Sequence, residues 1–211
     1  MAKQIITFFI GGAADASRYF GVGPNFIVRD YVKIPFDEIA PSHCQSEYLG
    51  YDAIYGQKHI QNNILSCIPN KEQTLINIVG FSLGGWNAAH LSEILNNQGY
   101  TVDVLITLDP VGVNTGVKLI SKIYWHEPTP KATHWINVFT NPPTLTPDDL
   151  VARAGGQWIP PKSEIHTSYE MPHHHREVWK LFGESLGEEG LSAAGYLLKF
   201  INRHEKDLPQ V

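Results

Sequence analysis

A serine flanked by glycines lies at the centre of residues 74–97, which read TLINIVGFSLGGWNAAHLSEILNN. Residues 75–79 form an apolar run rich in β-branched side chains, which predicts a buried strand. The residues after the serine place apolar side chains at helical spacing and predict a helix that stops near Gly99. Between the two stands Gly80-Phe81-Ser82-Leu83-Gly84, a G-x-S-x-G motif. A strand, a tight turn and a helix are the context in which this motif forms a nucleophile elbow.

The physical demands of such an elbow favour Ser82 as a nucleophile. The serine must sit at the end of a strand, with strained backbone angles and an exposed hydroxyl. Glycines at 80 and 84 remove Cβ atoms where the strand and the helix cross. The helix N-terminus then lies near the negative charge that develops during acyl transfer. The alternative interpretation is an ordinary Gly-Ser turn that caps a helix.

Length and composition predict one globular domain over residues 1–211. Hydrophobic residues make up 43% of the chain, charged residues only 18%, and the formal net charge is -5. No basic run exists, which argues against nucleic acid as a partner. Cys44 and Cys67 have no metal-ligand spacing, and two reduced thiols are a simpler interpretation than one disulfide.

The sequence contains no signal for membrane insertion or cleavable export. No apolar stretch approaches the ~20 residues that span a bilayer. The N-terminal apolar run from Ile5 to Ile10 is too short for the core of a signal peptide. We therefore expect a cytoplasmic protein, unless a dedicated secretion system exports it.

Three further apolar runs predict strands of the same sheet as the elbow strand. They cover residues 4–10, 102–108 and 133–140, and the run over 102–108 is almost continuously apolar. Such runs are typical of a parallel sheet that is covered on both faces. With helices between them, they predict an α/β fold, with a mostly parallel sheet flanked by helices.

The loop after the first strand is the expected source of an oxyanion donor. Residues 11–14 are all small, so their backbone N–H groups are free to approach a ligand. In an acyl-transfer enzyme the other donor is the N–H that follows the nucleophile. The predicted oxyanion hole is therefore Leu83 with Gly12, and Ala13 is the alternate to Gly12.

The predicted catalytic acid is Asp109, which directly follows the strand over residues 102–108. The carboxyl end of that strand lies on the same sheet edge as Ser82. Asp103 is near the start of the strand and is discounted for that reason. Asp148 and Asp149 are the alternative acids, but no strand end fixes them.

A general base is expected late in the chain, and residues 173–175 are three consecutive histidines. Of these we prefer His174, with His175 and then His173 as alternates, because the next helix is expected to begin near Arg176. Two other interpretations compete: metal binding by a His-rich tract and solvated surface histidines without a role. No second cluster of metal ligands stands at suitable spacing, and the reaction needs no cofactor.

The remaining segments are read more coarsely. A strand is expected over residues 25–32, and helices over 52–67, from about 176, and over 191–202. Residues 111–133 and 141–168 are irregular and rich in turn residues, which predicts a lid or a pocket wall.

The motifs together resemble the α/β-hydrolase superfamily, most closely its lipase and esterase branch and small bacterial hydrolases. The resemblance rests on Ser82 in GFSLGG, Asp109 in TLDPVG, the histidines of PHHHREVW and the opening FFIGGAAD. It covers most of the chain and implies a minimal α/β-hydrolase fold. The family's first two strands are missing, and Gly-Gly stands where many lipases have His-Gly in the oxyanion loop.

The function predicted is that of a serine hydrolase that cleaves carboxylic esters through a Ser-His-Asp triad and an acyl-enzyme. The substrate is a small molecule or a lipid. One alternative is a thioesterase or acyltransferase with the same triad. Another is an inactive α/β-hydrolase-fold binding module, which a separated or blocked triad would favour.

Overall fold

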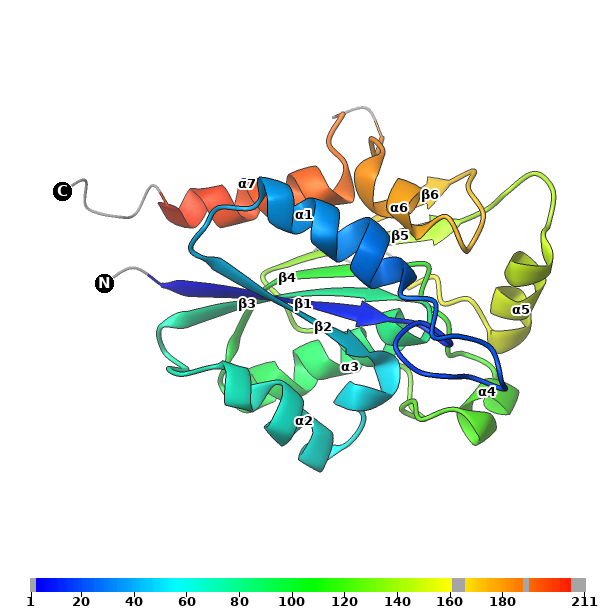
Figure 1. Cartoon of the computed structure of the whole chain (residues 1–211), viewed down its shortest axis with the longest axis horizontal. Coiled ribbons are helices and arrows are strands. Elements are labelled where there is room, and N and C mark those ends of the chain that lie inside the picture. The colour runs from blue at the N-terminus through cyan, green and yellow to red at the C-terminus, as the bar shows by residue number, and fades with distance from the viewer. Residues whose placement is uncertain (1–2, 161–165, 188–189, 206–211) are drawn as a thin grey trace.

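The molecule is built on a six-stranded sheet in which every neighbouring pair of strands is parallel (Figure 1). The computed structural model describes residues 3–160, 166–187 and 190–205. The strand order is β2-β1-β3-β4-β5-β6. The strands are β1 (Gln4–Gly11), β2 (Cys44–Gly50), β3 (Thr74–Phe81), β4 (Thr101–Leu108), β5 (His134–Thr140) and β6 (His166–Met171).

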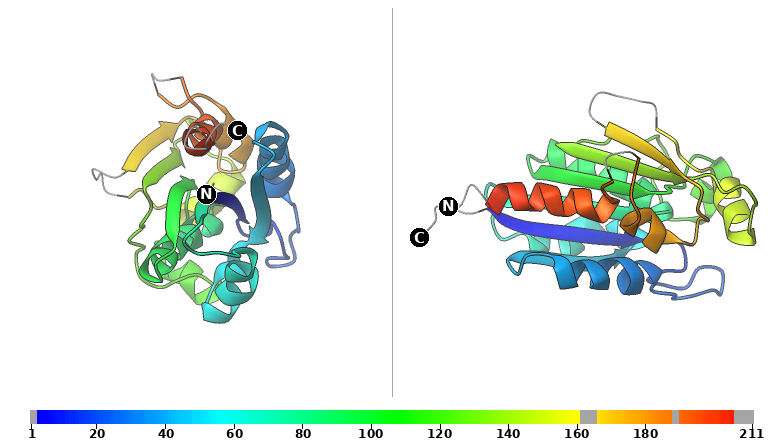
Figure 2. Two further views of the ribbon diagram at one scale, coloured as in Figure 1. Left: turned by 90° about the vertical axis from the view of Figure 1, so that its left-hand side faces the viewer. Right: turned by 90° about the horizontal axis from the view of Figure 1, so that it is seen from above.

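Helices cover both faces of the sheet (Figures 1 and 2). One face carries α1 (Ile34–Ile39), α6 (Val178–Gly183) and α7 (Ala193–Glu205), and the other carries α2 (Gln57–Asn63) and α3 (Leu83–Asn97). Two further helices, α4 (Thr115–Ile120) and α5 (Pro147–Gly155), lie beyond the carboxyl ends of the strands. The predicted α/β class, with a parallel sheet flanked by helices, is confirmed.

Alternate side chains of the central strands pack into two separate hydrophobic cores, one on each face of the sheet. In β1, Ile5 and Phe9 pack with the layer of α1, α6 and α7. Ile6, Phe8 and Ile10 face the other way and pack with α2 and α3. Because both faces of β1 are buried, its sequence is one apolar run, and this run allowed the strand to be predicted.

The predicted strand over residues 25–32 is wrong. Residues Arg29–Lys33 form a π-helical turn that continues directly into α1. Val28, Val32 and Phe36, spaced four apart, are all buried in the same core, which is helical spacing. The second strand is instead β2, an edge strand whose side chains alternate between partly buried and exposed. Its single buried face gives a weak sequence signal.

Two other expectations need correction. The helix predicted over residues 52–67 is broken into a 3₁₀ turn (Tyr51–Ile54), α2 and a second 3₁₀ turn (Leu65–Cys67). Gly56 before α2 has φ of +88°, which interrupts the helix. The segment predicted as irregular over residues 141–168 contains α5 and the start of β6, while residues 161–165 lie outside the described part.

The other predicted elements agree with the structure. Strands over residues 4–10, 102–108 and 133–140 correspond to β1, β4 and β5, and the last two helices correspond to α6 and α7. Cys44 and Cys67 are not joined in a disulfide. Within the described ranges, no helix combines the length and apolarity needed to cross a membrane.

His90 on α3 is a buried histidine that lies between a backbone carbonyl and an aromatic ring. Its side chain is only 7% exposed, and its Nε2 lies 2.9 Å from the carbonyl oxygen of His126. Its ring packs against Tyr124, with centroids 4.7 Å apart. Burial lowers the pKa of His90 to about 4, because the charged imidazolium is poorly solvated there.

We predict that His90 lowers the free energy of unfolding as the pH falls from about 6.5 to about 4.5. The unfolded chain takes up this proton near pH 6.5, whereas the folded protein resists it until about pH 4. The free energy of unfolding should therefore fall by about 2–3 kcal/mol over this range through His90 alone. Urea unfolding at both pH values should show a smaller fall in His90→Gln, and an equal fall in the two proteins would contradict the prediction.

Candidate active site

Ser82 occupies a strained turn between β3 and α3 at the carboxyl edge of the sheet. Its backbone angles are φ 56° and ψ -125°, a region that costs a non-glycine residue about 1–3 kcal/mol. The neighbouring glycines permit the tight crossing. A Cβ on Gly80 would lie 2.6 Å from Ala88, and one on Gly84 would lie 2.6 Å from backbone oxygens of β1. The strand-turn-helix geometry is therefore that of the elbow expected from the sequence.

A continuous hydrogen-bond chain links Ser82 to His175 and Asp109. The Nε2 atom of His175 lies 3.0 Å from Ser82 Oγ, and its Nδ1 lies 2.5 Å from Asp109 Oδ2. The imidazole also packs on the ring of Phe81, with centroids 4.8 Å apart. An imidazole held in this way by a carboxylate can accept the serine proton at Nε2 and return it.

Asp109 is fully buried, and its carboxylate is surrounded by donors. Oδ1 accepts the backbone N–H of Thr140 at 2.9 Å and the Gln157 side-chain amide at 2.5 Å, while Oδ2 accepts the Thr140 hydroxyl at 2.9 Å. Burial raises the pKa of Asp109, but the bond from His175 and these other donors outweigh it, so the pKa lies below its ordinary value. The carboxylate is thus ionised beside the imidazole.

Thr140 and Gln157 are the site residues that the sequence analysis missed. Thr140 ends β5, the strand beside β4, so its position at this edge follows once the sheet order is known. Gln157 follows α5 in the irregular segment, where it forms an isolated bridge with Val111. No periodic pattern marks such a residue.

The three consecutive histidines each contact a different carboxylate, which corrects the preference for His174. His174 Nδ1 lies 2.7 Å from Asp149, and His173 Nε2 lies 2.7 Å from Glu184. Only His175, the first alternate, reaches both Ser82 and Asp109. The loop turns before α6, so the three adjacent side chains point in different directions. The order of the histidines in the sequence does not show which of them faces Ser82.

Asp149, one of the alternative acids, holds the histidine loop by its backbone instead of contacting the His175 ring. It is 2% exposed, and its carboxylate accepts the backbone N–H of His175 at 2.7 Å. It also accepts the Thr146 N–H and hydroxyl, both at 2.7 Å, in a capping box at the start of α5. Burial opposes ionisation, but these donors and His174 lower the pKa of Asp149 well below its ordinary value.

The other two carboxylates weighed in the sequence, those of Asp148 and Asp103, do not contact the His175 ring. Asp148 is 53% exposed and stands 3.9 Å from Arg176. Asp103 lies near the start of β4 and contacts His204 of α7 at 2.9 Å, at the opposite edge of the sheet. This agrees with the reason for discounting Asp103.

Two backbone segments flank Ser82 where an oxyanion would form. Leu83 is the first residue of α3, so its N–H has no carbonyl within the helix to bind. Gly12 lies directly against the serine: a Cβ there would be 2.8 Å from Ser82 Cβ and 3.3 Å from Oγ. Ala13 lines the same cavity.

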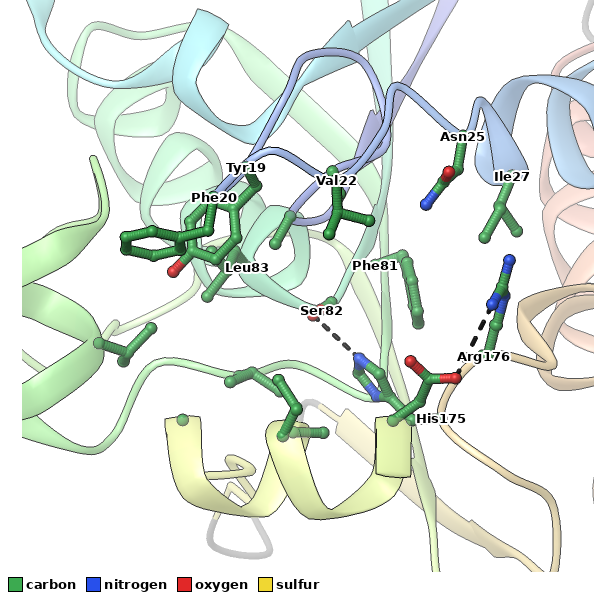
Figure 3. Close-up of a pocket in the computed structure, with 18 residues that line it drawn as sticks. Tyr19, Phe20, Val22, Asn25, Ile27, Phe81, Ser82, Leu83, His175 and Arg176 are labelled. Carbon is green, nitrogen blue, oxygen red and sulfur yellow. Dashed lines mark hydrogen bonds and ion pairs between the residues drawn. The ribbon is translucent and has the colours of Figure 1, made fainter. Parts of the chain in front are cut away.

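A cavity of about 420 Å³ opens beside Ser82 and His175 (Figure 3). Its walls come from the loop after β1, the segment that contains α4, and α5. Most of its lining is apolar, including Tyr19, Val22, Leu83, Val111, Val117 and Ala152. The segments predicted as pocket walls over residues 111–133 and 141–168 both contribute lining residues. In the described part of the chain, no three His, Cys, Asp or Glu side chains are grouped to hold a metal ion.

We predict that Asp149→Asn destabilises the fold, because it weakens an acceptor shared by several buried donors. The free energy of unfolding, measured by urea denaturation at pH 7, should fall by about 2–4 kcal/mol. Asp148→Asn is the matched control on the same helix. That carboxylate is exposed, so the control should stay within about 0.5 kcal/mol of wild type. Equal effects of the two substitutions would contradict the role assigned to Asp149.

The chain was compared with known proteins at the level of sequence and of structure. Its sequence matches none of the family models and none of the curated proteins with which it was compared. Among solved structures it is similar to "YbtT - Type II thioesterase from Yersiniabactin NRPS/PKS biosynthetic pathway", at 11% identity and TM-score 0.48, covering 95% of this chain and 93% of that one. It is also similar to a "Structure of arylesterase", at 11% identity and TM-score 0.44, covering 94% and 77%.

Proposed function

We propose that this protein is a serine hydrolase that cleaves carboxylic esters through an acyl-enzyme. The observation that carries the proposal is the hydrogen-bond chain from Ser82 Oγ through His175 to the buried carboxylate of Asp109, beside an apolar cavity. A strained serine, a histidine within reach of it and a carboxylate that orients the histidine are the parts that nucleophilic acyl transfer requires.

In this mechanism Ser82 Oγ attacks the acyl carbon while His175 Nε2 takes the serine proton. The resulting oxyanion is stabilised by the N–H groups of Leu83 and Gly12, with Ala13 as the alternate second donor. His175 then gives the proton to the leaving group, and the bond between that group and the acyl carbon breaks. Water repeats the sequence and releases the acid. Asp109 keeps His175 Nδ1 protonated throughout.

A thioester is an equally suitable substrate for these steps. The leaving sulfur takes the place of the alcohol oxygen, and the serine, histidine and oxyanion donors act in the same way. The proposed reaction class is therefore hydrolysis of an acyl ester or thioester, without a metal or organic cofactor among the groups that act.

We predict that Ser82→Ala and His175→Ala each lower kcat on p-nitrophenyl hexanoate by about 10⁴-fold or more, because each removes a group that acts in the transition state. His174→Ala is the matched control, since its ring contacts Asp149 and not Ser82. It should retain kcat within about tenfold. Circular dichroism would verify folding of each variant. A His174 variant as inactive as the His175 variant would contradict the assignment of the base.

We predict that Gly12→Ala lowers kcat on the same ester by about 10²–10³-fold, the usual cost of losing an oxyanion donor. The added methyl would meet the Ser82 side chain and displace the loop that carries the donor. Gly116→Ala on α4 is the control, because a Cβ there meets no atom within 4 Å. Full activity of Gly12→Ala would show that this loop does not contribute the second donor.

A further inference from the structure

The cavity differs chemically on the two sides of Ser82. Figure 3 shows Tyr19, Phe20 and Leu83 on one side of the serine, and Asn25 and Arg176 on the other side, beyond Phe81. The Tyr19 hydroxyl is already bound to Ser121 at 2.7 Å, so the first side presents rings and aliphatic groups. The second side, by contrast, presents an amide and a guanidinium beside the aliphatic side chain of Ile27.

The position of His175 decides which side receives which part of a substrate. The proton that His175 Nε2 takes from Ser82 must later reach the leaving group, so that group lies on the histidine side. Arg176 follows His175 directly and lines the cavity on this same side. The acyl group then extends the other way, past Leu83 toward Tyr19 and Phe20.

The polar side has side-chain donors that bind no other group in the part of the chain that the structure describes. In residues 3–160, 166–187 and 190–205, neither the Asn25 side chain nor the Arg176 guanidinium makes a hydrogen bond. The nearest carboxylate to Arg176 is that of Asp148, 3.9 Å away, and the two side chains are 60% and 53% exposed. Such an exposed pair holds a guanidinium only weakly, which leaves the donors of Arg176 available to a planar or tetrahedral anion.

We propose that Arg176, with Asn25, forms a subsite for an anionic leaving group. The substrate class is thus an apolar acyl ester or thioester of an alcohol or thiol that carries a carboxylate or phosphate. This inference rests on the proposed function: the bond from acyl carbon to oxygen or sulfur breaks, water supplies the hydroxyl to the acid, and the proton goes to the anionic alcohol or thiol.

The test compares two esters of similar size and shape whose leaving groups differ in charge: the hexanoyl esters of 4-hydroxybenzoate and 4-hydroxybenzamide. For the wild type, kcat/KM should be about 5- to 20-fold higher for the anionic ester, mainly through KM, because Arg176 contacts a part of the substrate remote from the reacting atoms. Raising the ionic strength should reduce this ratio.

Three variants sharpen the comparison. Arg176→Gln should bring the ratio of the two kcat/KM values close to one. Asp148→Asn should raise the ratio, because it removes the carboxylate that competes for the guanidinium. Arg153→Gln, on an exposed position of α5 that does not line the cavity, should leave both rates and the ratio unchanged.

The outcomes separate this inference from the proposed function. If both esters are cleaved in a Ser82-dependent way with a ratio near one that Arg176→Gln does not alter, the anionic subsite is refuted and the hydrolase proposal stands. If neither ester is cleaved by the wild type, the hydrolase proposal fails, and the subsite fails with it.

Discussion

The buried carboxylate of Asp109 is the constraint on which the candidate site depends. An ionised group without exposure is costly unless several donors surround it. Here those donors come from Thr140 at the end of β5, from Gln157 after α5 and from His175 after β6. Three segments far apart in the sequence therefore converge on one charge, and each must be in place for the histidine to face Ser82.

The parallel sheet makes this convergence possible. Since every strand runs in the same direction, the segments after β1, β3, β4, β5 and β6 all emerge at one edge. Gly12, Ser82, Asp109 and His175 lie in or beyond those segments. The positive φ angles of Ser82 and Asp109, 56° and 43°, show that the backbone is strained at the candidate site. Burial of the central strands in two hydrophobic cores supports that strain.

The sequence was sufficient to predict the elements that are buried along almost their whole length. The central strands and α3 were predictable because their side chains are buried almost completely, as in β3. The positions of Ser82 and Asp109 followed from where those strands end. Edge strand β2 was not predictable, because one of its faces is exposed. Residues 25–32 look like a strand in the sequence, but most of them form part of a helix. Two buried residues at helical spacing, Val28 and Val32, are too few to distinguish a helix from a strand.

The choice among His173, His174 and His175 lay beyond sequence reasoning for a different reason. Each has a carboxylate partner, namely Glu184, Asp149 or Asp109. The partner is determined by the loop conformation, which Asp149 fixes through a backbone contact to His175. Gln157 is likewise a tertiary contact without a local pattern. The chemical difference between the two sides of the cavity also depends on the directions in which side chains point, and no sequence motif predicts these directions.

The most direct measurement is reaction of the protein with a fluorophosphonate, followed by mass spectrometry of its peptides. We expect a single adduct on Ser82, because only an activated serine beside an oxyanion hole reacts readily with this reagent. We also expect much slower labelling of Asp109→Asn, in which His175 would no longer be held in the tautomer that accepts the serine proton. An intact, folded protein that gives no adduct on Ser82 would contradict the central claim.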